Sequence, residues 1–284
     1  MLSSDWLTTS SGIRVPRIIY GTAWKKERTA DLVATALQTG FRGIDTACQP
    51  KHYAEQLVGV GIQRIKEQGI DREDLYIQTK FTPLSSQDPD QLPYDKTASI
   101  TSQVVQSFET SKHNLKTDYV DCLLLHSPLD SHEKTMQAWN AMEKIHKAGG
   151  ASLLGISNCY DINVIKLLYA EATVKPAVMQ NRFYRDTGYE VATRKWCANH
   201  NIIFQSFWSL TANGHILDSD TIKILTIKYE KTAAQIFFRY LTQSGIVPLT
   251  GTNSEQHMRE DLNIFDFKLS SEDLSNVNLI LNQD

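Results

Sequence analysis

The sequence has few of the features that mark specialised classes of protein. It contains four cysteines, which are far apart and form neither a Cys-x-x-Cys pair nor a Cys/His pair at zinc spacing: Cys48, Cys122, Cys159 and Cys197. We therefore expect small buried thiols in an intracellular protein and no metal centre. No apolar run approaches the roughly 18 residues that cross a membrane. The first residues lack the basic segment and apolar run of a signal peptide, so a cytoplasmic protein is expected.

Basic side chains are not in excess in this chain of 284 residues. Lys and Arg number 29 against 32 Asp and Glu, a formal net charge of −3 at pH 7. A protein held to nucleic acid by its charge needs a marked basic excess, so no nucleic-acid partner is expected. The composition, 41% hydrophobic and 21% charged, excludes long disorder. The expected state is a monomer or a weak dimer.

One pattern recurs along the chain about eight times: a short apolar run rich in β-branched residues, then a longer stretch with helical periodicity. The spacing averages about thirty residues, as a βαβ repeat requires. A hairpin around Ser10-Ser11-Gly12, from Trp6 to Val15, should come first. The expected strands are 17–21, 43–46, 75–80, 120–126, 153–158, 177–181, 202–207 and 246–250, and the clearest helices are 30–39, 98–115, 133–148 and 232–243.

Nearly continuous apolar strands favour a parallel sheet that is covered on both faces. Eight units suit a closed α/β barrel of the (β/α)8 or TIM type, formed by one domain over residues 1–284 with an N-terminal β-hairpin. An open doubly wound sheet is the alternative, but no glycine-rich phosphate loop follows the first strand. The single Gly-x-Gly, Gly59-Val60-Gly61, falls in or after a helical stretch and is not a dinucleotide loop.

Polar side chains stand where the expected strands end. Asp45 ends the second strand, Lys80 the third and His126 the fourth. Ser157-Asn158 and Gln180-Asn181 end the next two. Each could be an isolated cap or a hydrogen-bonded core residue, but the carboxyl ends of parallel barrel strands surround the active site. Polar groups in register on consecutive strands therefore predict one shared site.

Asp45, Lys80 and His126 can support proton transfer. A lysine beside a carboxylate stays charged, and its charge lowers the pKa of a neighbouring phenol from about 10. Tyr53, in the loop or first helical turn after Asp45, is the phenol within reach, and His126 would orient a substrate oxygen. His52 is expected to be a loop residue, because no His-x-His or His-Glu-x-x-His pattern indicates a metal site.

Five segments in order resemble the aldo-keto reductase superfamily: GFRGIDTA, QTKF, YVDCLLLHSP, GISN and PAVMQNRF. The resemblance extends from the hairpin at Trp6 to the helix near Met258. It implies an NAD(P)H-dependent oxidoreductase that reduces small aldehydes or ketones to alcohols by hydride transfer, with a tyrosine as general acid. The implied catalytic tetrad is Asp45, Tyr53, Lys80 and His126.

The resemblance also implies how a nicotinamide cofactor is held, with NADP(H) favoured and NAD(H) possible. A Ser, an Asn and a Gln would bind the carboxamide, and an aromatic ring would stack on the nicotinamide. The implied residues at the nicotinamide are Thr22, Ser157, Asn158, Gln180 and Phe207. Trp24, with His126, would line the substrate side. The loop after the last strand would cradle the cofactor's phosphates with Gly251, Thr252, Asn253 and His257.

The chain departs from the family pattern in the loop after Asp45. The family tyrosine follows that aspartate after four residues, where this chain has Pro50, and Tyr53 comes three residues later. The string resembles a subgroup with a Gln-Pro-Lys-His-Tyr loop, so Tyr53 is kept as the acid. The alternative is a surface tyrosine, with activity lost or carried by His52.

Two further departures concern the end of the chain. Gly251-Thr252 replaces the usual Lys-Ser pair, His257 replaces the Arg, and Arg259 is displaced in register. Without these cations the residues themselves do not favour NADP(H) over NAD(H). The tail that ends at Asp284 is short, which predicts an open site with broad substrate selection.

Two other functions remain as alternatives. One is a catalytically weak NAD(P)-binding regulatory or redox-sensing subunit on the same barrel. A purely binding role makes no demand on Lys80 or Tyr53, so the complete tetrad argues against it. The other is an unrelated barrel, such as a phosphate-binding isomerase, whose fluorescence NADPH would not quench.

Overall fold

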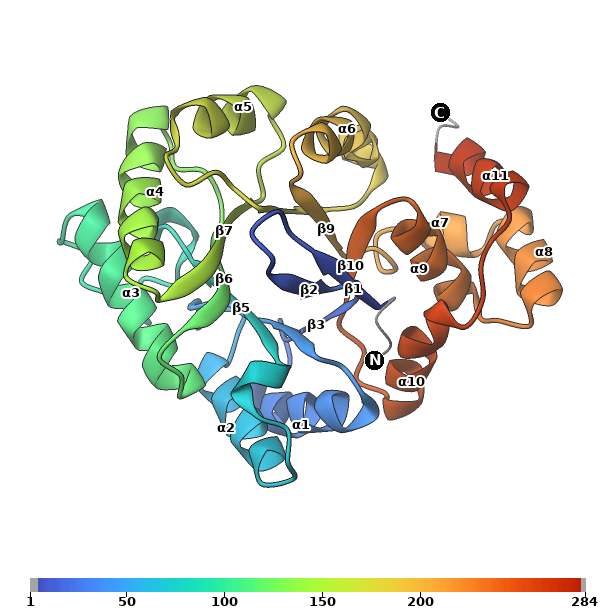
Figure 1. Ribbon diagram of the computed structural model, residues 1–284, viewed down its shortest axis with the longest axis horizontal. Coiled ribbons are helices and arrows are strands. Elements are labelled where there is room, and N and C mark those ends of the chain that lie inside the picture. Colours follow the sequence, from blue (N-terminus) through green and yellow to red (C-terminus); the bar gives the residue numbers. More distant parts are fainter. Residues whose placement is uncertain (1–4, 282–284) are drawn as a thin grey trace.

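The computed structural model describes residues 5–281, and its strands form a closed parallel barrel (Figure 1). Around the ring the order is β10-β3-β4-β5-β6-β7-β8-β9. The strands are β3 (Ile19–Gly21), β4 (Gly43–Asp45), β5 (Tyr76–Phe81), β6 (Val120–Leu125), β7 (Ala151–Ser157), β8 (Val178–Arg182), β9 (Ile203–Phe207) and β10 (Ile246–Thr250). The predicted (β/α)8 barrel is confirmed, and the open doubly wound sheet is wrong. Residues 1–4 and 282–284, which the predicted domain and tail include, lie outside the described part.

Helices cover the outside of the barrel (Figure 1). They are α1 (Thr29–Thr39), α2 (Glu55–Lys66), α3 (Ile100–Leu115), α4 (His132–Lys147), α5 (Ile162–Glu171), α6 (Val191–Asn199), α7 (Gly214–Leu217), α8 (Asp220–Tyr229), α9 (Ala233–Gln243), α10 (Glu255–Leu262) and α11 (Ser271–Leu281). The helix predicted over 98–115 begins at Ile100, because the side chain of Ser99 caps it by accepting a hydrogen bond from the backbone N–H of Ser102.

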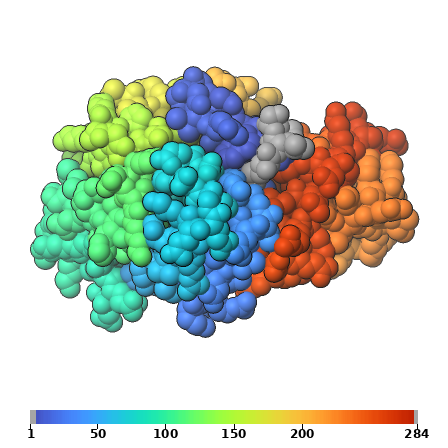
Figure 2. Space-filling view, turned by 60° about the horizontal axis from the view of Figure 1, so that its bottom comes forward, coloured from blue at the N-terminus to red at the C-terminus, as the bar shows by residue number. Residues whose placement is uncertain are grey.

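The predicted hairpin is present and closes the amino-terminal end of the barrel. Strands β1 (Trp6–Thr8) and β2 (Arg14–Pro16) pair antiparallel, with Leu7 opposite Val15. Val15 is fully buried in the cluster of side chains that fills the barrel interior. In Figure 1 the hairpin lies across one opening of the barrel, and in Figure 2 it stands at the molecular surface. The carboxyl ends of the strands lie at the opposite end of the barrel.

Gly59 and Gly61 lie inside α2, as their sequence context predicted. A Cβ atom on Gly59 would come within 2.0 Å of the carbonyl oxygen of Asn114 in α3. One on Gly61 would come within 2.7 Å of the carbonyl oxygen of Ala30 in α1. These glycines therefore allow α2 to pack closely against both neighbouring helices and bind no phosphate.

The four cysteines are buried free thiols, as expected. Burial raises the pKa of the Cys122 thiol above its ordinary value of 9. Within residues 5–281, no group of His, Cys, Asp and Glu could hold a metal ion. The same part of the chain has no helix that is long and apolar enough to cross a membrane.

Candidate active site

The four side chains of the implied tetrad lie together at the carboxyl ends of neighbouring strands. Asp45 ends β4, Lys80 is the penultimate residue of β5, and His126 directly follows β6. Tyr53 lies in the loop between β4 and α2. Its ring centroid is 6.1 Å from that of His126 and 5.2 Å from Lys80 Nζ. The four groups therefore share the end of the barrel at which α/β barrels have their active sites.

Lys80 and Asp45 form a buried ion pair. Lys80 Nζ is 2.7 Å from both carboxylate oxygens of Asp45 and donates a third hydrogen bond, of 2.8 Å, to the carbonyl oxygen of Thr46. Three donated hydrogen bonds require three N–H groups, so the side chain is an ammonium. Burial lowers the pKa of Lys80 below its ordinary value of 10.5, and the charge of Asp45 opposes that shift.

The hydroxyl of Tyr53 makes no hydrogen bond within residues 5–281. All three donors of Lys80 are already used, so none binds the phenol oxygen. Burial and the charge of Asp45 raise the pKa of Tyr53 above its ordinary value of 10. The pKa of Tyr53 is therefore raised and not lowered as predicted, because burial and the carboxylate of Asp45 outweigh the charge of the paired Lys80. Tyr53 is a protonated phenol at neutral pH.

The lengthened loop before α2 is folded back onto itself. The carbonyl oxygen of Gln49 accepts hydrogen bonds from the backbone N–H groups of His52, at 3.1 Å, and Tyr53, at 3.0 Å. Gln49 Nε2 donates to the carbonyl oxygen of Ser86 at 2.6 Å. Trp24 N donates to the carbonyl oxygen of His52 at 2.7 Å, and the two rings lie 4.1 Å apart. These contacts return Tyr53 to the barrel despite the three additional residues.

His126 is a neutral imidazole held from one side. Its Nδ1 lies 2.6 Å from Thr82 Oγ1, and the side chain of Thr82 is fully buried. Burial lowers the pKa of His126 well below 6.5, and the charges of Lys80 and His52 lower it further. Thr82 therefore occupies Nδ1, and Nε2 remains for another partner.

The family resemblance implies that Ser157, Asn158 and Gln180 bind the nicotinamide carboxamide. In the structure, hydrogen bonds link these residues to one another and to His126. Ser157 Oγ donates to the carbonyl oxygen of Gln180 at 2.7 Å. Asn158 Nδ2 donates to the carbonyl oxygen of His126 at 2.8 Å. Asn158 has a left-handed backbone with φ of 51°, so it turns the chain at the end of β7. Asn181, next to Gln180, faces the other way and donates to the carbonyl oxygen of Cys159.

Gln78 and Gln205, which the sequence reasoning missed, lie next to Gln180 and Asp45 in the barrel interior. Gln78 Nε2 donates to Asp45 Oδ1 at 2.6 Å and to Gln205 Oε1 at 2.8 Å. Gln180 Nε2 donates to the same two oxygens at 2.9 and 3.0 Å. Gln78 precedes Lys80 by two residues and therefore lies on the same face of β5. This spacing could have indicated that Gln78 points toward the site.

The remaining residues implied near the nicotinamide differ in exposure. Thr22 is fully buried, and its Oγ1 donates to the carbonyl oxygen of Asp45 at 2.9 Å. Phe207 is half-buried at the end of β9. Trp24 has 58% of its surface exposed and a left-handed backbone with φ of 63°. Trp24 therefore presents an apolar ring to solvent beside the tyrosine loop.

The loop 251–253 connects β10 to the start of α10. Tyr20 Oη donates to the carbonyl oxygen of Thr252 at 2.9 Å and holds the loop against β3. Ser254 Oγ caps α10 by accepting a hydrogen bond from the backbone N–H of His257 at 3.3 Å. The side chain of His257 is exposed. The helix start behind this loop is suited to an anion.

A cation near this loop was also missed from the sequence. Lys25 Nζ donates a hydrogen bond to the carbonyl oxygen of Gly251, and the side chain is buried. Burial and the like charge of Arg28 lower the pKa of Lys25 below 10.5. Arg259, displaced in register, forms an exposed ion pair of 2.6 Å with Glu255. The loop itself lacks the family's cations, as the sequence shows, but Lys25 reaches it from the loop after β3.

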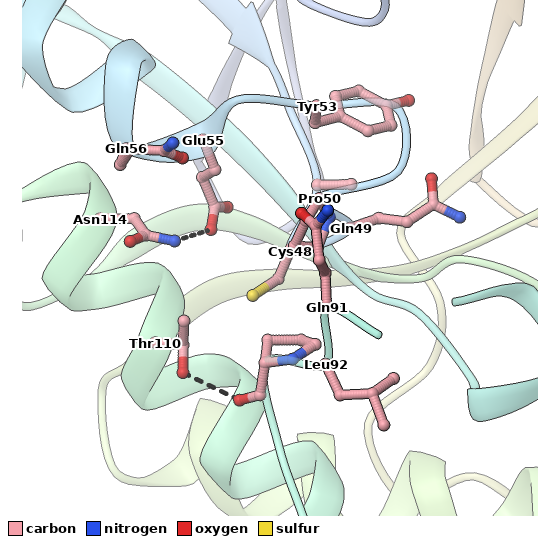
Figure 3. Close-up of a pocket in the computed structure, with 12 residues that line it drawn as sticks. Cys48, Gln49, Pro50, Tyr53, Glu55, Gln56, Gln91, Leu92, Thr110 and Asn114 are labelled. Atoms are coloured by element: carbon pink, nitrogen blue, oxygen red, sulfur yellow. Dashed lines mark hydrogen bonds between the residues drawn. The ribbon is translucent and has the colours of Figure 1, made fainter. Parts of the chain in front are cut away.

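A pocket of about 310 Å³ lies on the outer side of the tyrosine loop (Figure 3). Tyr53 is one of its lining residues, and its side chain extends away from Glu55 and Asn114 at the far wall. Asn114 Nδ2 donates to Glu55 Oε2 at 3.0 Å, and burial raises the pKa of Glu55 above 4.5. Asp45, Lys80 and His126 do not line this pocket, so Tyr53 is the one member of the tetrad that does.

A closed parallel barrel whose proton-transferring groups gather at the carboxyl ends of its strands has the architecture of a TIM-barrel enzyme. The chain belongs to the aldo/keto reductase family, whose profile matches residues 17–282. It is an NAD(P)H-dependent oxidoreductase, and it shares the carbonyl-reducing chemistry of its family.

Curated relatives match the chain over most of its length. Glyoxal reductase of Bacillus subtilis is 32% identical, over 99% of this chain and 94% of that protein. An uncharacterized oxidoreductase of the same organism, YtbE, is 31% identical over 96% and 91%. Methylglyoxal reductase DkgA of Yersinia pestis is 30% identical over 87% and 82%.

Solved structures agree with the fold. The crystal structure of an aldo/keto reductase from Brucella melitensis matches with a TM-score of 0.82 and 26% identity, over 97% of this chain and 98% of that one. An aldo-keto reductase (AKR2E5) of the silkworm Bombyx mori, solved as a complex with NADPH, matches with a TM-score of 0.81 and 25% identity, over 96% and 86%.

Proposed function

We propose that the protein reduces small aldehydes and ketones to alcohols with NADPH, and that Tyr53 is the general acid. The observation that carries this proposal is the meeting of Tyr53, the Lys80–Asp45 ion pair and the neutral His126 at one end of the barrel. Hydride transfer builds negative charge on the carbonyl oxygen, so that oxygen needs a proton donor and a hydrogen-bond donor. The cofactor would supply the hydride when bound.

Tyr53 would donate the proton. Its raised pKa keeps the hydroxyl protonated at neutral pH, and no hydrogen bond within the described chain has to be broken to release it. An alkoxide is a stronger base than a phenolate, so the transfer is favourable despite that pKa. The ammonium of Lys80, 5.2 Å from the ring centroid, would stabilise the phenolate as it forms.

His126 would orient the carbonyl by donating a hydrogen bond to its oxygen. If the hydroxyl of Thr82 donates to Nδ1, the neutral imidazole carries its proton on Nε2. The lowered pKa of His126 keeps the ring in this form at neutral pH. Tyr53 and His126 would then contact the same oxygen with two donors.

The residues at the strand ends fit a nicotinamide carboxamide. That group has one acceptor and two N–H donors, and Ser157, Asn158 and Gln180 offer hydroxyl and amide groups of both polarities. Thr22 and Phe207 would lie against the ring.

Two cations support NADP(H) as the preferred cofactor. Lys25 donates to the carbonyl oxygen of Gly251, and Arg28 is close enough for its charge to act on Lys25 and on Tyr20, whose hydroxyl binds the same loop. Neither cation forms an ion pair within residues 5–281. Like charges held together are stabilised by an anion, and the start of α10 favours one at the same place. The 2′-phosphate that distinguishes NADPH from NADH would supply that anion.

The substrates we propose are small reactive carbonyl compounds. Relatives at 32% and 30% identity are a glyoxal reductase and a methylglyoxal reductase. Trp24 and Trp208 expose 58% and 48% of their surfaces, and both follow barrel strands near the site. An apolar, exposed rim supports broad selection among small aldehydes and ketones.

We also propose that the chain is a single domain. Strand β10 pairs with both β3 and β9, so the first and last units of the barrel complete the same sheet. Removing either half would leave an open sheet with unpaired edges.

A steady-state assay tests the proposed function. The purified protein is mixed with NADPH or NADH and with glyoxal, methylglyoxal or an aromatic aldehyde, and the loss of the reduced cofactor is followed. Turnover with NADPH is expected for at least one carbonyl. Quenching of protein fluorescence by NADPH without turnover of any of them would favour the regulatory-subunit alternative. The absence of both would contradict a nicotinamide-dependent function.

A further inference from the structure

A layer of three glutamines crosses the inside of the barrel below the candidate site. Gln78 of β5, Gln180 of β8 and Gln205 of β9 have exposed fractions of 0%, 2% and 0%. Strands β5 and β9 lie on opposite sides of the barrel (Figure 1), so this glutamine layer spans it. A buried amide costs free energy unless its polar atoms are bonded, so the layer depends on its internal hydrogen bonds.

The carboxylate of Asp45 fixes which way two of these amides face. An ionised carboxylate can only accept hydrogen bonds, and its pairing with Lys80 keeps Asp45 ionised. Asp45 Oδ1 lies 2.6 Å from the amide of Gln78 and 2.9 Å from that of Gln180. The atom nearest Asp45 must therefore be Nε2 in both glutamines.

Gln205 completes the arrangement. Its Oε1 accepts from Gln78 Nε2 at 2.8 Å and from Gln180 Nε2 at 3.0 Å, and its Nε2 donates to Gln78 Oε1 at 3.0 Å. Tyr76 Oη donates to the same Oε1 at 3.0 Å. Both N–H groups of Gln180 are thus used, by Asp45 and by Gln205. Its Oε1 accepts no hydrogen bond within residues 5–281, so it is available to another donor.

We infer that Gln205, held in place by Gln78 and acting together with Asp45, is a positioning residue that keeps the amide of Gln180 with its oxygen, not its nitrogen, toward the nicotinamide carboxamide. This inference rests on the proposed function, in which Gln180 contacts that group. An oxygen accepts from the carboxamide N–H₂. A half-turn of the Gln180 amide would present a donor to a donor, so the layer selects cofactors that carry a carboxamide.

The inference predicts how the protein discriminates between NADPH and its 3-acetylpyridine analogue, in which a methyl ketone replaces the carboxamide and has no N–H. Binding of both is measured by quenching of protein fluorescence, without any reaction. The native protein should prefer NADPH by about tenfold, the value of one satisfied hydrogen bond. In Gln205→Met only Asp45 still accepts from the amide of Gln180, so this amide is no longer held on both of its N–H groups. The preference should then fall to about twofold or less, with little change in the dissociation constant of the analogue.

Two further variants keep the test independent of folding. Gln103→Met removes a buried amide from α3, where it donates to the carbonyl oxygens of Lys96 and Ala98, and should keep the native preference. The double variant Gln78→Met/Gln205→Met leaves no unpaired partner in the pair, so it carries the test if the single variant does not fold. If Gln205→Met or the double variant prefers NADPH over the analogue as strongly as the native protein does, the inference is overturned.

Gln180→Met separates this inference from the proposed function. If Gln180→Met loses the preference while Gln205→Met keeps it, Gln180 contacts the cofactor but the glutamine layer does not position it. If Gln180→Met also keeps the preference, the proposed contact of Gln180 with the carboxamide is wrong, and the inference fails with it.

Discussion

The ammonium of Lys80 is paired with Asp45 and lies 5.2 Å from the ring centroid of Tyr53. Together with burial and His52, its charge lowers the pKa of His126, so that imidazole stays neutral. Its three donors bind Asp45 and Thr46, which leaves the hydroxyl of Tyr53 unbound and protonated. Burial and this ion pair together leave Tyr53 protonated and His126 neutral, the states that the proposed function requires of them.

Lys25→Met should weaken the binding of NADPH and leave that of NADH nearly unchanged. A charge-assisted hydrogen bond to a phosphate contributes about 1.5–3 kcal/mol, so the dissociation constant of NADPH should rise about tenfold or more. Titration by fluorescence quenching measures both cofactors. Lys26→Met is the matched control, because this exposed neighbour has the same charge and should change neither constant by more than about twofold. Equal weakening of NADPH and NADH would count against the proposed phosphate contact.

The helices around the barrel determine where the loops of the site begin. Helix α2 starts at Glu55, two residues after Tyr53, so its position on α3 sets the end of the tyrosine loop. Gly59 makes this position possible, because its Cα approaches the carbonyl of Asn114 more closely than any side chain would allow. Two strands from β4 around the ring, β10 leads into α10 through the loop that would receive the phosphates.

Gly59→Ala should destabilise the protein by about 1–3 kcal/mol. Alanine is about 1 kcal/mol better than glycine in a helix, but the added Cβ would lie 2.0 Å from Asn114 O and force α2 away from α3. Unfolding by urea measures the loss. Gly214→Ala, at the start of α7, has nothing within 4 Å of the new Cβ and should change stability by no more than about 0.5 kcal/mol. A Gly59→Ala variant as stable as the native protein would contradict the close packing.

Asp261→Asn should stabilise the protein at alkaline pH. Burial raises the pKa of Asp261 from 3.8 to about 7, although Thr250 Oγ1 donates to its Oδ2 at 2.7 Å. The folded state then binds this proton more tightly than the unfolded state, so the contribution is complete below pH 3.8 and is lost as pH rises through about 7. The shift of about three pH units corresponds to about 4 kcal/mol at most.

The measurement is urea unfolding of both proteins at about pH 5 and about pH 8. The native protein should lose stability between these values, and Asp261→Asn should lose less, because it has no proton to release there. Equal pH dependence in the two proteins would show that Asp261 does not titrate in this range.

Over the whole molecule, the parts that could be predicted from the sequence are those with local signals. Apolar runs predicted eight strands, and the pairing of β9, β10 and β3 into a ring followed from their number and spacing. Polar residues at strand ends predicted that Asp45, Lys80 and His126 would meet. The glutamine layer could not be predicted, because Gln78 and Gln205 are 127 residues apart and their contact depends on the diameter of the closed barrel.

Electrostatic states also depend on the whole structure. The sequence placed Lys80 near Tyr53 but not the three acceptors that use its donors, so the predicted direction of the Tyr53 pKa was wrong. Lys25 was missed because it is 226 residues from Gly251. Residue types and their order therefore predict which groups meet, whereas distances of a few ångströms decide their charge and partners.

The central claim, that Tyr53 donates the proton, is tested most directly by comparing Tyr53→Phe with the native protein. The rate of NADPH oxidation with methylglyoxal and the dissociation constant of NADPH are measured on the same preparations. The variant lacks only the hydroxyl, so NADPH should bind as before while the turnover rate falls about 100-fold or more. A Tyr53→Phe variant that turns over at the native rate would contradict the claim and leave His52 or His126 as the proton donor.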